Sequence, residues 1–329
     1  MDLTMRPLLT DDIPVLAKHL AAVEAVDKTG EHYSEADLEE EFANPDIEVG
    51  KDIVGAFVGD DLVGYFAVYP RSGDGDHQKV HVEGSVDPAR RGEGIGHRLV
   101  EAMVARADEV HRERHPNLPA RYSVSGLTSN DAQAALLADH GFVAERWNFV
   151  MRADLSRLDL GPELPELPEG LRLLTYSPEL DRAMLEAHNE AFLDHPDFTP
   201  WTEVEWKQWV SDSRNFRPEL SLLVVEESAP DVVVAYIQSN EFDAYFEATG
   251  RREAYVAKVG TRREHRGRGL AGALLRHALV RYREAGFDEA SLDVDSENPT
   301  GALGVYERAG FEVESRWTNY ALVREPVLG

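Results

Sequence analysis

The sequence of 329 residues contains no cysteine. This absence excludes disulfide bonds, thiolate nucleophiles and cysteine-ligated zinc. The sequence also has no apolar stretch long enough to span a membrane, and it does not open with a basic region followed by an apolar run. We therefore expect a cytoplasmic protein with no membrane partner.

Basic residues are scarce relative to acidic ones. The chain has 34 Lys and Arg against 61 Asp and Glu, a formal net charge of -27. This balance argues against a nucleic-acid partner. It is typical of a solvated acidic surface, and it is also compatible with a cationic amine substrate. No spacing of His, Asp and Glu suggests a metal site. With 43% hydrophobic residues, the chain is long enough for two globular domains.

One stretch in the second half combines a strand, a turn and a helix. A β-type segment over 255–259 enters a turn with Gly267 and Gly269, and apolar residues then recur with the period of one helix face over 270–282. Glycines let the backbone approach a ligand, and the first amides of a helix have no partner within the helix. The turn is either a pyrophosphate site or a plain strand-to-helix turn, and the glycines alone leave both readings open.

The same pattern occurs in the first half. Arg91-x-x-Gly94-x-Gly96 matches Arg266-x-x-Gly269-x-Ala271 at an offset of 175 residues (266 minus 91), and Gly141-Phe142 repeats as Gly310-Phe311 at an offset of 169 (310 minus 141). A repeat of half the chain predicts two similarly folded domains. We place them at residues 1–155 and 171–329, joined by a proline-rich, extended spacer at 156–170.

Local periodicity and turn residues indicate the other elements. A capping box at Ser34 and Asp37 marks the start of one helix. Helices are expected over 13–23, 34–42, 95–107, 179–192, 270–282 and 298–309, and a further helix, opened by residues 197–203, carries Trp206 and Trp209. Strands are expected around 8–10 and over 53–58, 62–69, 79–86, 171–174, 222–225, 232–237, 255–259, 291–295 and 317–322, the last closing the sheet of the second domain.

These features together resemble the GCN5-related N-acetyltransferase (GNAT) superfamily, in the tandem form of the mycothiol synthases and related actinobacterial acetyltransferases. The resemblance implies an α/β fold in which each domain is a mixed, mostly antiparallel twisted sheet flanked by helices. It also implies acetyl-CoA as cofactor, and two strands, the one before the turn and 290–295, that part to admit the pantetheine arm. The implied activity is acetyl transfer to a primary amine of a small molecule. The alternatives are acetylation of a protein or N-terminal amine, and a non-catalytic acyl-CoA-binding regulator.

The resemblance further implies which residues bind the cofactor. They are Val259, Thr261, Arg266, Gly267, Arg268, Gly269, Leu270, Ala271 and Asn298 in the second domain, and Val86, Arg91, Gly92, Gly94, Ile95 and Gly96 in the first. Tyr306, four residues before Gly310, would be the general acid that protonates the leaving thiolate. The matching residue of the first domain is Leu137, which has no proton to give. We therefore expect the second domain to be the catalyst and the first to be catalytically degenerate.

The general base and the acceptor site are less defined. Strand alternation predicts that Glu253 and Tyr255 share a face with Ala257 and Val259, and Glu253 is our candidate base. The candidates for acceptor binding are Glu241, Trp201 and His195. Each of these residues also has an ordinary reading as a surface acid, a packed aromatic or an exposed histidine. Either a monomer or a homodimer fits the sequence.

Overall fold

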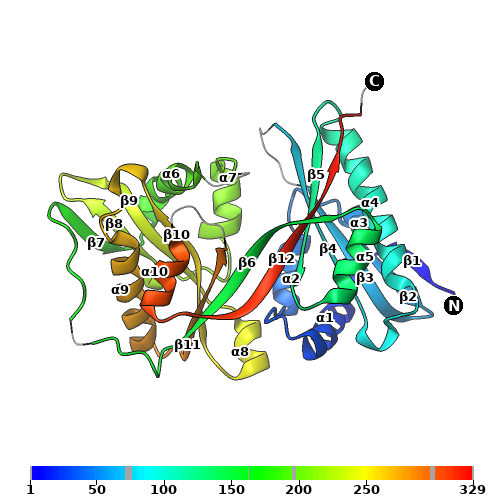
Figure 1. The fold of residues 1–329 in the computed structure, drawn as a ribbon, viewed down its shortest axis with the longest axis horizontal. Coiled ribbons are helices and arrows are strands. Elements are labelled where there is room, and N and C mark those ends of the chain that lie inside the picture. Colours follow the sequence, from blue (N-terminus) through cyan, green and yellow to red (C-terminus); the bar gives the residue numbers. More distant parts are fainter. Residues whose placement is uncertain (1, 71–75, 162, 195–197, 297–300, 328–329) are drawn as a thin grey trace. The chain divides into compact units, whose positions relative to one another are not determined.

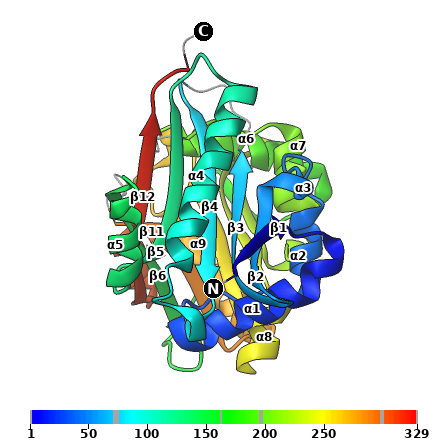
Figure 2. The same cartoon turned by 90° about the vertical axis from the view of Figure 1, so that its right-hand side faces the viewer.

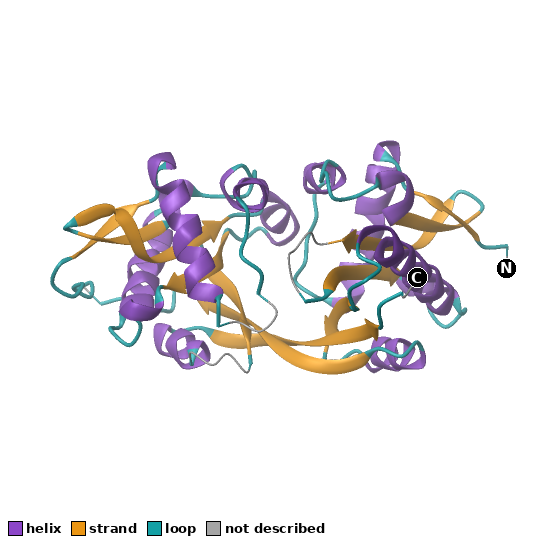
Figure 3. Ribbon diagram, turned by 90° about the horizontal axis from the view of Figure 1, so that it is seen from above, coloured by secondary structure: helices purple, strands orange, loops and turns teal. Residues whose placement is uncertain are grey.

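We analysed a computed structural model of the chain, which describes residues 2–70, 76–161, 163–194, 198–296 and 301–327. The chain forms two compact units. Unit 1 comprises Met1–Trp147 and Arg316–Gly329, and unit 2 comprises Asn148–Ser315. Each unit is an α/β structure, and helices lie on both faces of its strands (Figure 3).

The sheet of unit 1 has the strand order β1-β2-β3-β4-β5-β12. Its strands are β1 (Thr4–Pro7), β2 (Ile53–Val58), β3 (Asp61–Pro70), β4 (Gln78–Val86), β5 (Ala120–Leu127) and the second part of β12 (Glu312–Arg324). Its helices are α1 (Ile13–Asp27), α2 (Glu35–Phe42), α3 (Val49–Asp52), α4 (Ile95–Arg114) and α5 (Asp131–Asp139), with short 3-10 turns at Thr10–Asp12 and Pro88–Arg90. Of the strand pairs, β4 and β5 run parallel and the others antiparallel.

Alternate residues of β3 show how unit 1 is layered. Phe66 and Val68 point into a core shared with α4, which lies in front of the strands in Figure 2. Tyr65 and Ala67 belong to the other core, which they share with α1 and α2. The predicted capping box is present, because the Ser34 hydroxyl accepts from the Asp37 amide at 3.2 Å and the Asp37 carboxylate accepts from the Ser34 amide at 2.9 Å.

Unit 2 repeats this architecture with the strand order β6-β11-β10-β9-β8-β7. Its strands are β6 (Val143–Asp154, from Asn148 on), β7 (Leu171–Thr175), β8 (Leu222–Glu226), β9 (Ala229–Asn240), β10 (Glu253–Thr261) and β11 (Glu289–Asp295). Its helices are α6 (Asp181–Phe192), α7 (Glu203–Trp206), α8 (Asp243–Thr249), α9 (Leu270–Glu284) and α10 (Ala302–Ala309), with 3-10 turns at Pro178–Leu180, Pro218–Leu220 and Arg263–His265 and a π-helical turn at Lys207–Ser211.

The two faces of this sheet carry different helices (Figure 1). On β8, Leu222 and Val224 belong to the core formed with α9 and α10, whereas Leu223 and Val225 belong to the core formed with α6 and α7. We refer to these two sides as the α9 face and the α6 face. The α6 face is the counterpart of the face of unit 1 that is covered by α1 and α2, since both are covered by the first helices of their unit.

The expected domain boundaries differ from the units in two places. Residues 317–324 do not close the sheet of unit 2. They pair antiparallel with β5 of unit 1, and Tyr320 and Leu322 enter its core. The edge of unit 2 is instead formed by residues 148–154 of β6, paired with β11. Each unit therefore contains a strand that a cut at residue 155 would assign to the other one.

The proline-rich segment is not a free spacer. Leu160 is 1% exposed and lies in the core of unit 2 on the α9 face. Side chains of α9 hold the segment at three backbone carbonyls, those of Leu158, Asp159 and Pro165, through Arg283, Arg276 and His277 respectively. Leu158 and Leu167 also pack against this core, so the segment is anchored by apolar side chains as well as by hydrogen bonds.

Candidate functional site

The two turns have the same backbone geometry. Gly267 and Gly269 have φ of 73° and 79°, and Gly92 and Gly94 have φ of 80° and 79°, all in the left-handed region that favours glycine. Gly269 and Gly94 are the N-cap residues of α9 and α4, and no side chain among the described residues caps either helix. The first amides of both helices are thus available to an anion such as a pyrophosphate.

The arginine of each turn braces it. Arg266 pairs with Asp194 at 2.6 Å and donates to the carbonyls of Ala191 and Thr261. Arg91 pairs with Asp27 at 2.7 Å and donates to the Val86 carbonyl. Their guanidinium groups therefore tie the turns to the C-terminal ends of α6 and α1. Any phosphate contacts then fall to the backbone and to exposed side chains such as Arg268.

Strands β10 and β11 separate near the turn, as expected. β10 pairs with β11 only from Glu253 to Val256, although both strands continue toward the turn. At the point where they part, β10 has a bulge. Val256 lies opposite Ser239 and Lys258 opposite Gln238, so Ala257 has no partner in the register with β9. In unit 1, β4 also leaves β5 after His81, but its described register with β3 is continuous, without a bulge.

Because of the bulge, the side chains of β10 do not alternate between the two faces as the sequence predicted. Glu253 and Tyr255 lie on the α6 face, because Ala254 and Val256 belong to the α9 core. After the extra residue the α6 face is taken by Lys258 and Gly260, and Val259 packs against the α9 core instead. The prediction that Val259 shares a face with Glu253 was therefore wrong. A single inserted residue reverses every side chain that follows it.

Tyr306 lies on α10 and is 9% exposed. Burial raises the pKa of its hydroxyl to about 12, so the phenol keeps its proton at neutral pH. The Phe311 amide donates to the Tyr306 carbonyl at 3.1 Å, and in unit 1 the Phe142 amide donates to the Leu137 carbonyl at 3.0 Å. The two positions are thus structurally equivalent, and in unit 1 a core leucine, 3% exposed, occupies the place of the phenol.

Comparisons with known proteins agree with this geometry. The pattern of the acetyltransferase (GNAT) family matches residues 19–142 and again residues 181–311. The chain belongs to the GNAT family. It is therefore an N-acetyltransferase that uses an acyl-CoA donor, built from two tandem GNAT domains.

Relatives of this acetyltransferase match it over most of their length. It is 32% identical to a mycothiol acetyltransferase of Thermobispora bispora over 267 residues, 79% of each chain, and 32% identical to one of Nocardia farcinica over 255 residues, 76% of each. Among solved structures, a GCN5-related N-acetyltransferase from Sphaerobacter thermophilus has a TM-score of 0.75 at 28% identity and covers 99% of this chain and 97% of its own. A tandem GNAT protein from the clavulanic acid biosynthesis pathway shares the fold, with a TM-score of 0.69 at 21% identity, and covers 98% of both chains.

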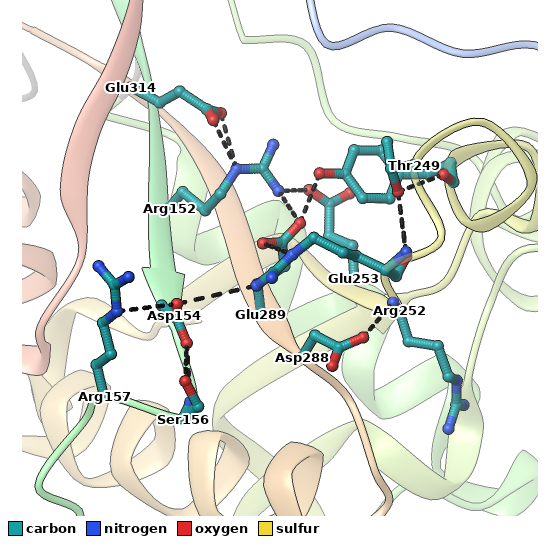
Figure 4. A network of polar contacts seen from close by, with 12 residues as sticks. Arg152, Asp154, Ser156, Arg157, Thr249, Arg252, Glu253, Asp288, Glu289 and Glu314 are labelled. Carbon is teal, nitrogen blue, oxygen red and sulfur yellow. Dashed lines mark hydrogen bonds and ion pairs between the residues drawn. The ribbon is translucent and has the colours of Figure 1, made fainter.

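Glu253 of the acetyltransferase lies in a buried network of charges on unit 2 (Figure 4). Arg152 of β6 donates to Glu253 at 2.5 Å, to Glu289 at 2.9 Å and to Glu314 at 2.8 Å. Glu289 also accepts from the hydroxyl of Tyr245. Burial raises the pKa of Glu253, and the charge of Arg152 partly opposes this rise. A carboxylate with a raised pKa is a better base than an exposed one, so the structure is compatible with the role expected from the sequence.

The remaining candidates of the acetyltransferase differ in their surroundings. Glu241 is clamped between Arg217 at 3.0 Å and Arg252 at 2.9 Å, so its charge is already compensated and we do not assign it to the acceptor. Trp201 lies on the α6 face, where the side-chain amide of Asn189 exchanges two hydrogen bonds with its backbone. Predicted residues His195 and Asn298 lie outside the described residues.

Three features of the site were not found from the sequence. They are the bulge at Ala257, the position of Lys258 on the α6 face, and the pairing of Arg152 with Glu253. Lys258 was the visible signal, since it interrupts an otherwise apolar strand between Ala257 and Val259. Within the described ranges, no grouping of three His, Asp or Glu side chains has the arrangement of a metal site, and no helix is long and apolar enough to cross a membrane.

Proposed function

We propose that unit 2 transfers an acetyl group from acetyl-CoA to a primary amine of a small molecule. The acetyl group and the class of acceptor are carried over from the relatives named mycothiol acetyltransferase, which are 32% identical over the aligned 267 and 255 residues. The observation that carries the assignment to unit 2 is the combination of an uncapped glycine turn, a bulged strand before it and a buried tyrosine on α10.

The residues present fit an acyl-CoA. A Cβ added at Gly267 or Gly269 would meet no other atom within 4 Å, so the turn is open to a ligand that approaches its backbone. The bulge leaves the backbone of Ala257 outside the ladder, where its amide can donate to a carbonyl oxygen. When bound, acetyl-CoA supplies a thioester whose carbonyl carbon accepts the amine and whose sulfur leaves.

The side chains of unit 2 supply the proton transfers. The acceptor amine must lose a proton, and Glu253 is the candidate base, acting directly or through water. Tyr306 holds a proton throughout the neutral range and donates a hydrogen bond, and finally the proton, to the departing sulfur. Unit 1 has the same turn but neither the bulge nor the phenol, so we propose that it is catalytically degenerate.

Calorimetric titration with acetyl-CoA and measurement of thiol release with a panel of amines test this proposal. The panel contains small amines and a peptide with a free N-terminus, because protein acetylation is the competing activity. We expect Tyr306→Phe to lower kcat by about 10²-fold or more while acetyl-CoA affinity is retained.

Tyr176→Phe is the matched control. Tyr176 is 8% exposed, lies in the same unit and donates to Asp181 at 3.0 Å. Its loss removes a buried hydroxyl of similar exposure without touching α10. Absence of acetyl-CoA binding, or equal kcat values in the two variants, would contradict the proposed function.

A further inference from the structure

The two units carry opposite charges at one equivalent position. In unit 1 Tyr65 lies opposite Ser85 on the paired strands β3 and β4, and Ala67 lies opposite Glu83. In unit 2 Tyr236 lies opposite Gly260 on β9 and β10, and Gln238 opposite Lys258. The offset from Glu83 to Lys258 is 175 residues (258 minus 83), the same as between the turns. A carboxylate in one copy is therefore an ammonium in the other.

The groups around Glu83 differ from those around Lys258. In unit 1 Glu83 accepts from the hydroxyls of Tyr65 at 2.9 Å and Tyr69 at 3.2 Å, and Tyr69 also donates to Glu41. Burial and the charge of Glu83 raise the pKa of Glu41 to about 7. This face of unit 1 therefore holds two carboxyl groups, Glu41 and Glu83, with His81 3.9 Å from Glu83.

In unit 2 the equivalent position holds a cation beside an aromatic ring, and its partner across the strand pair is a glutamine. The Lys258 ammonium lies 4.8 Å from the centroid of the Trp201 ring. Gln238, directly across the strand pair, is 1% exposed, and its Oε1 has no hydrogen-bond partner among the described residues. The Tyr236 hydroxyl turns to His188 instead of to a strand residue, with 2.6 Å to its Nδ1.

Lys258 also has a defined relation to the proposed reaction centre. It directly follows the bulged residue Ala257 and shares the α6 face with Glu253 and Tyr255. An ammonium at this place repels an acceptor whose only charge is its own amine, and it attracts one that also carries an anion. We therefore expect the charge of this side chain to affect which acceptor binds more than it affects acyl-CoA binding at the turn.

We propose that Lys258 is a specificity-determining residue whose ammonium binds an anionic group, a carboxylate or a phosphate, of the acceptor. The acceptors of unit 2 are then small primary amines that also carry a negative charge. This inference rests on the proposed function and narrows its substrate class. Glu83 makes the corresponding face of unit 1 unsuitable for such an acceptor.

Matched pairs of amines test the proposal. Glycine is compared with glycinamide and phosphoethanolamine with ethanolamine, and kcat/KM is measured for the intact protein, Lys258→Met and Lys258→Glu. Each amine is also titrated calorimetrically into protein saturated with CoA, so that preference is read even without turnover. The two pairs distinguish a carboxylate from a phosphate as the recognised group.

We expect the intact protein to prefer the anionic member of at least one pair by about tenfold or more, the effect of one charge-assisted hydrogen bond. Lys258→Met should remove this preference through KM, and Lys258→Glu should invert it. Glu83→Gln, which keeps the hydroxyl contacts of the equivalent residue in unit 1, should leave the preference as it is.

Two results would overturn the inference. One is the absence of preference or binding for both anionic amines by the intact protein. The other is an equal loss of kcat/KM for both members of a pair in Lys258→Met. This result would show that Lys258 only packs on Trp201 or only adds to the overall charge of the site. Failure of the proposed function is distinguishable, because it appears as absent acetyl-CoA binding in the separate titration.

Discussion

Replacing Arg152 with methionine is expected to destabilise unit 2 strongly. The Arg152 side chain is 17% exposed, and the carboxylates of Glu253 and Glu289 that it holds are 9% and 5% exposed. Methionine fills a similar length of the same space but has no charge. The substitution thus leaves Glu253 buried without its cation, while Arg251 still contacts Glu289 at 2.7 Å.

The magnitude follows from burial. Removing one partner of a buried ion pair costs about 3–5 kcal/mol, because a charge remains desolvated without compensation. For a unit of this size, one kcal/mol shifts Tm by about 2–4 °C, so we expect a fall of roughly 6–20 °C. Arg157→Met is the control. Arg157 contacts Asp154 at 3.4 Å in the same region, but its side chain is 86% exposed, and such a pair contributes at most about 1 kcal/mol.

The loss should also depend on pH in a defined direction. The pKa of Glu253 is already raised by burial, and Arg152 lowers it, so the variant raises it further. The folded variant then binds a proton that the unfolded chain releases above its ordinary pKa of 4.5. Stability therefore falls as pH rises above that value, and the deficit of Arg152→Met should shrink from pH 7.5 toward pH 5.

Urea unfolding monitored by fluorescence, with the transitions of the two units fitted separately, measures these values. If the free energies of unfolding of Arg152→Met and Arg157→Met differ by less than about 1 kcal/mol at pH 7.5, the buried network does not stabilise unit 2 as argued. A deficit that stays constant down to pH 5 would contradict the role given to Glu253.

Two further predictions concern glycines. Gly267→Glu places a carboxylate in the open turn and should weaken acetyl-CoA binding by about tenfold or more in calorimetry. Gly170→Glu is the control, because Gly170 has a φ of 79° and lies outside the turn, so this variant carries the same backbone strain and should retain the affinity. Equal losses of affinity in the two variants would show that backbone strain alone is responsible. Gly260→Ala places a Cβ against the Tyr236 ring and should lower the free energy of unfolding in urea by about 1–3 kcal/mol. Gly50→Ala is the control, because a Cβ added there meets no atom within 4 Å. An unchanged free energy of unfolding in Gly260→Ala would mean that the Tyr236 ring moves freely.

The parts of the fold predicted best from the sequence were those fixed by local geometry. The turns were found because Gly269 and Gly94 need positive φ at the start of a helix, a requirement that one residue meets or fails. The Ser34 capping box was found for the same reason, since both partners lie within four residues.

The parts that were missed depend on distant residues. The strand 317–322 was found, but its partner was not, because its alternation reads the same whether it pairs with β5 or with a strand of the second half. Arg152 is an ordinary arginine in the sequence, and it becomes part of the candidate site only because β6 lies beside β11. The bulge at Ala257 leaves no compositional mark beyond the lysine that follows it.

The differences between the units point to where function has diverged. Gly267 and Gly92 differ in φ by 7° (80° minus 73°), and Gly269 and Gly94 have the same φ of 79°, so the two turns have nearly the same backbone geometry. The differences lie elsewhere, at Tyr306 against Leu137 and at Lys258 against Glu83, with a bulge in one strand only. Neither Leu137 nor Glu83 disturbs the turn of unit 1, so these side chains can differ between the units while the turn geometry stays the same. Under the proposal for Lys258, a single substitution on β10 changes the charge that faces the acceptor and leaves the glycine turn in place.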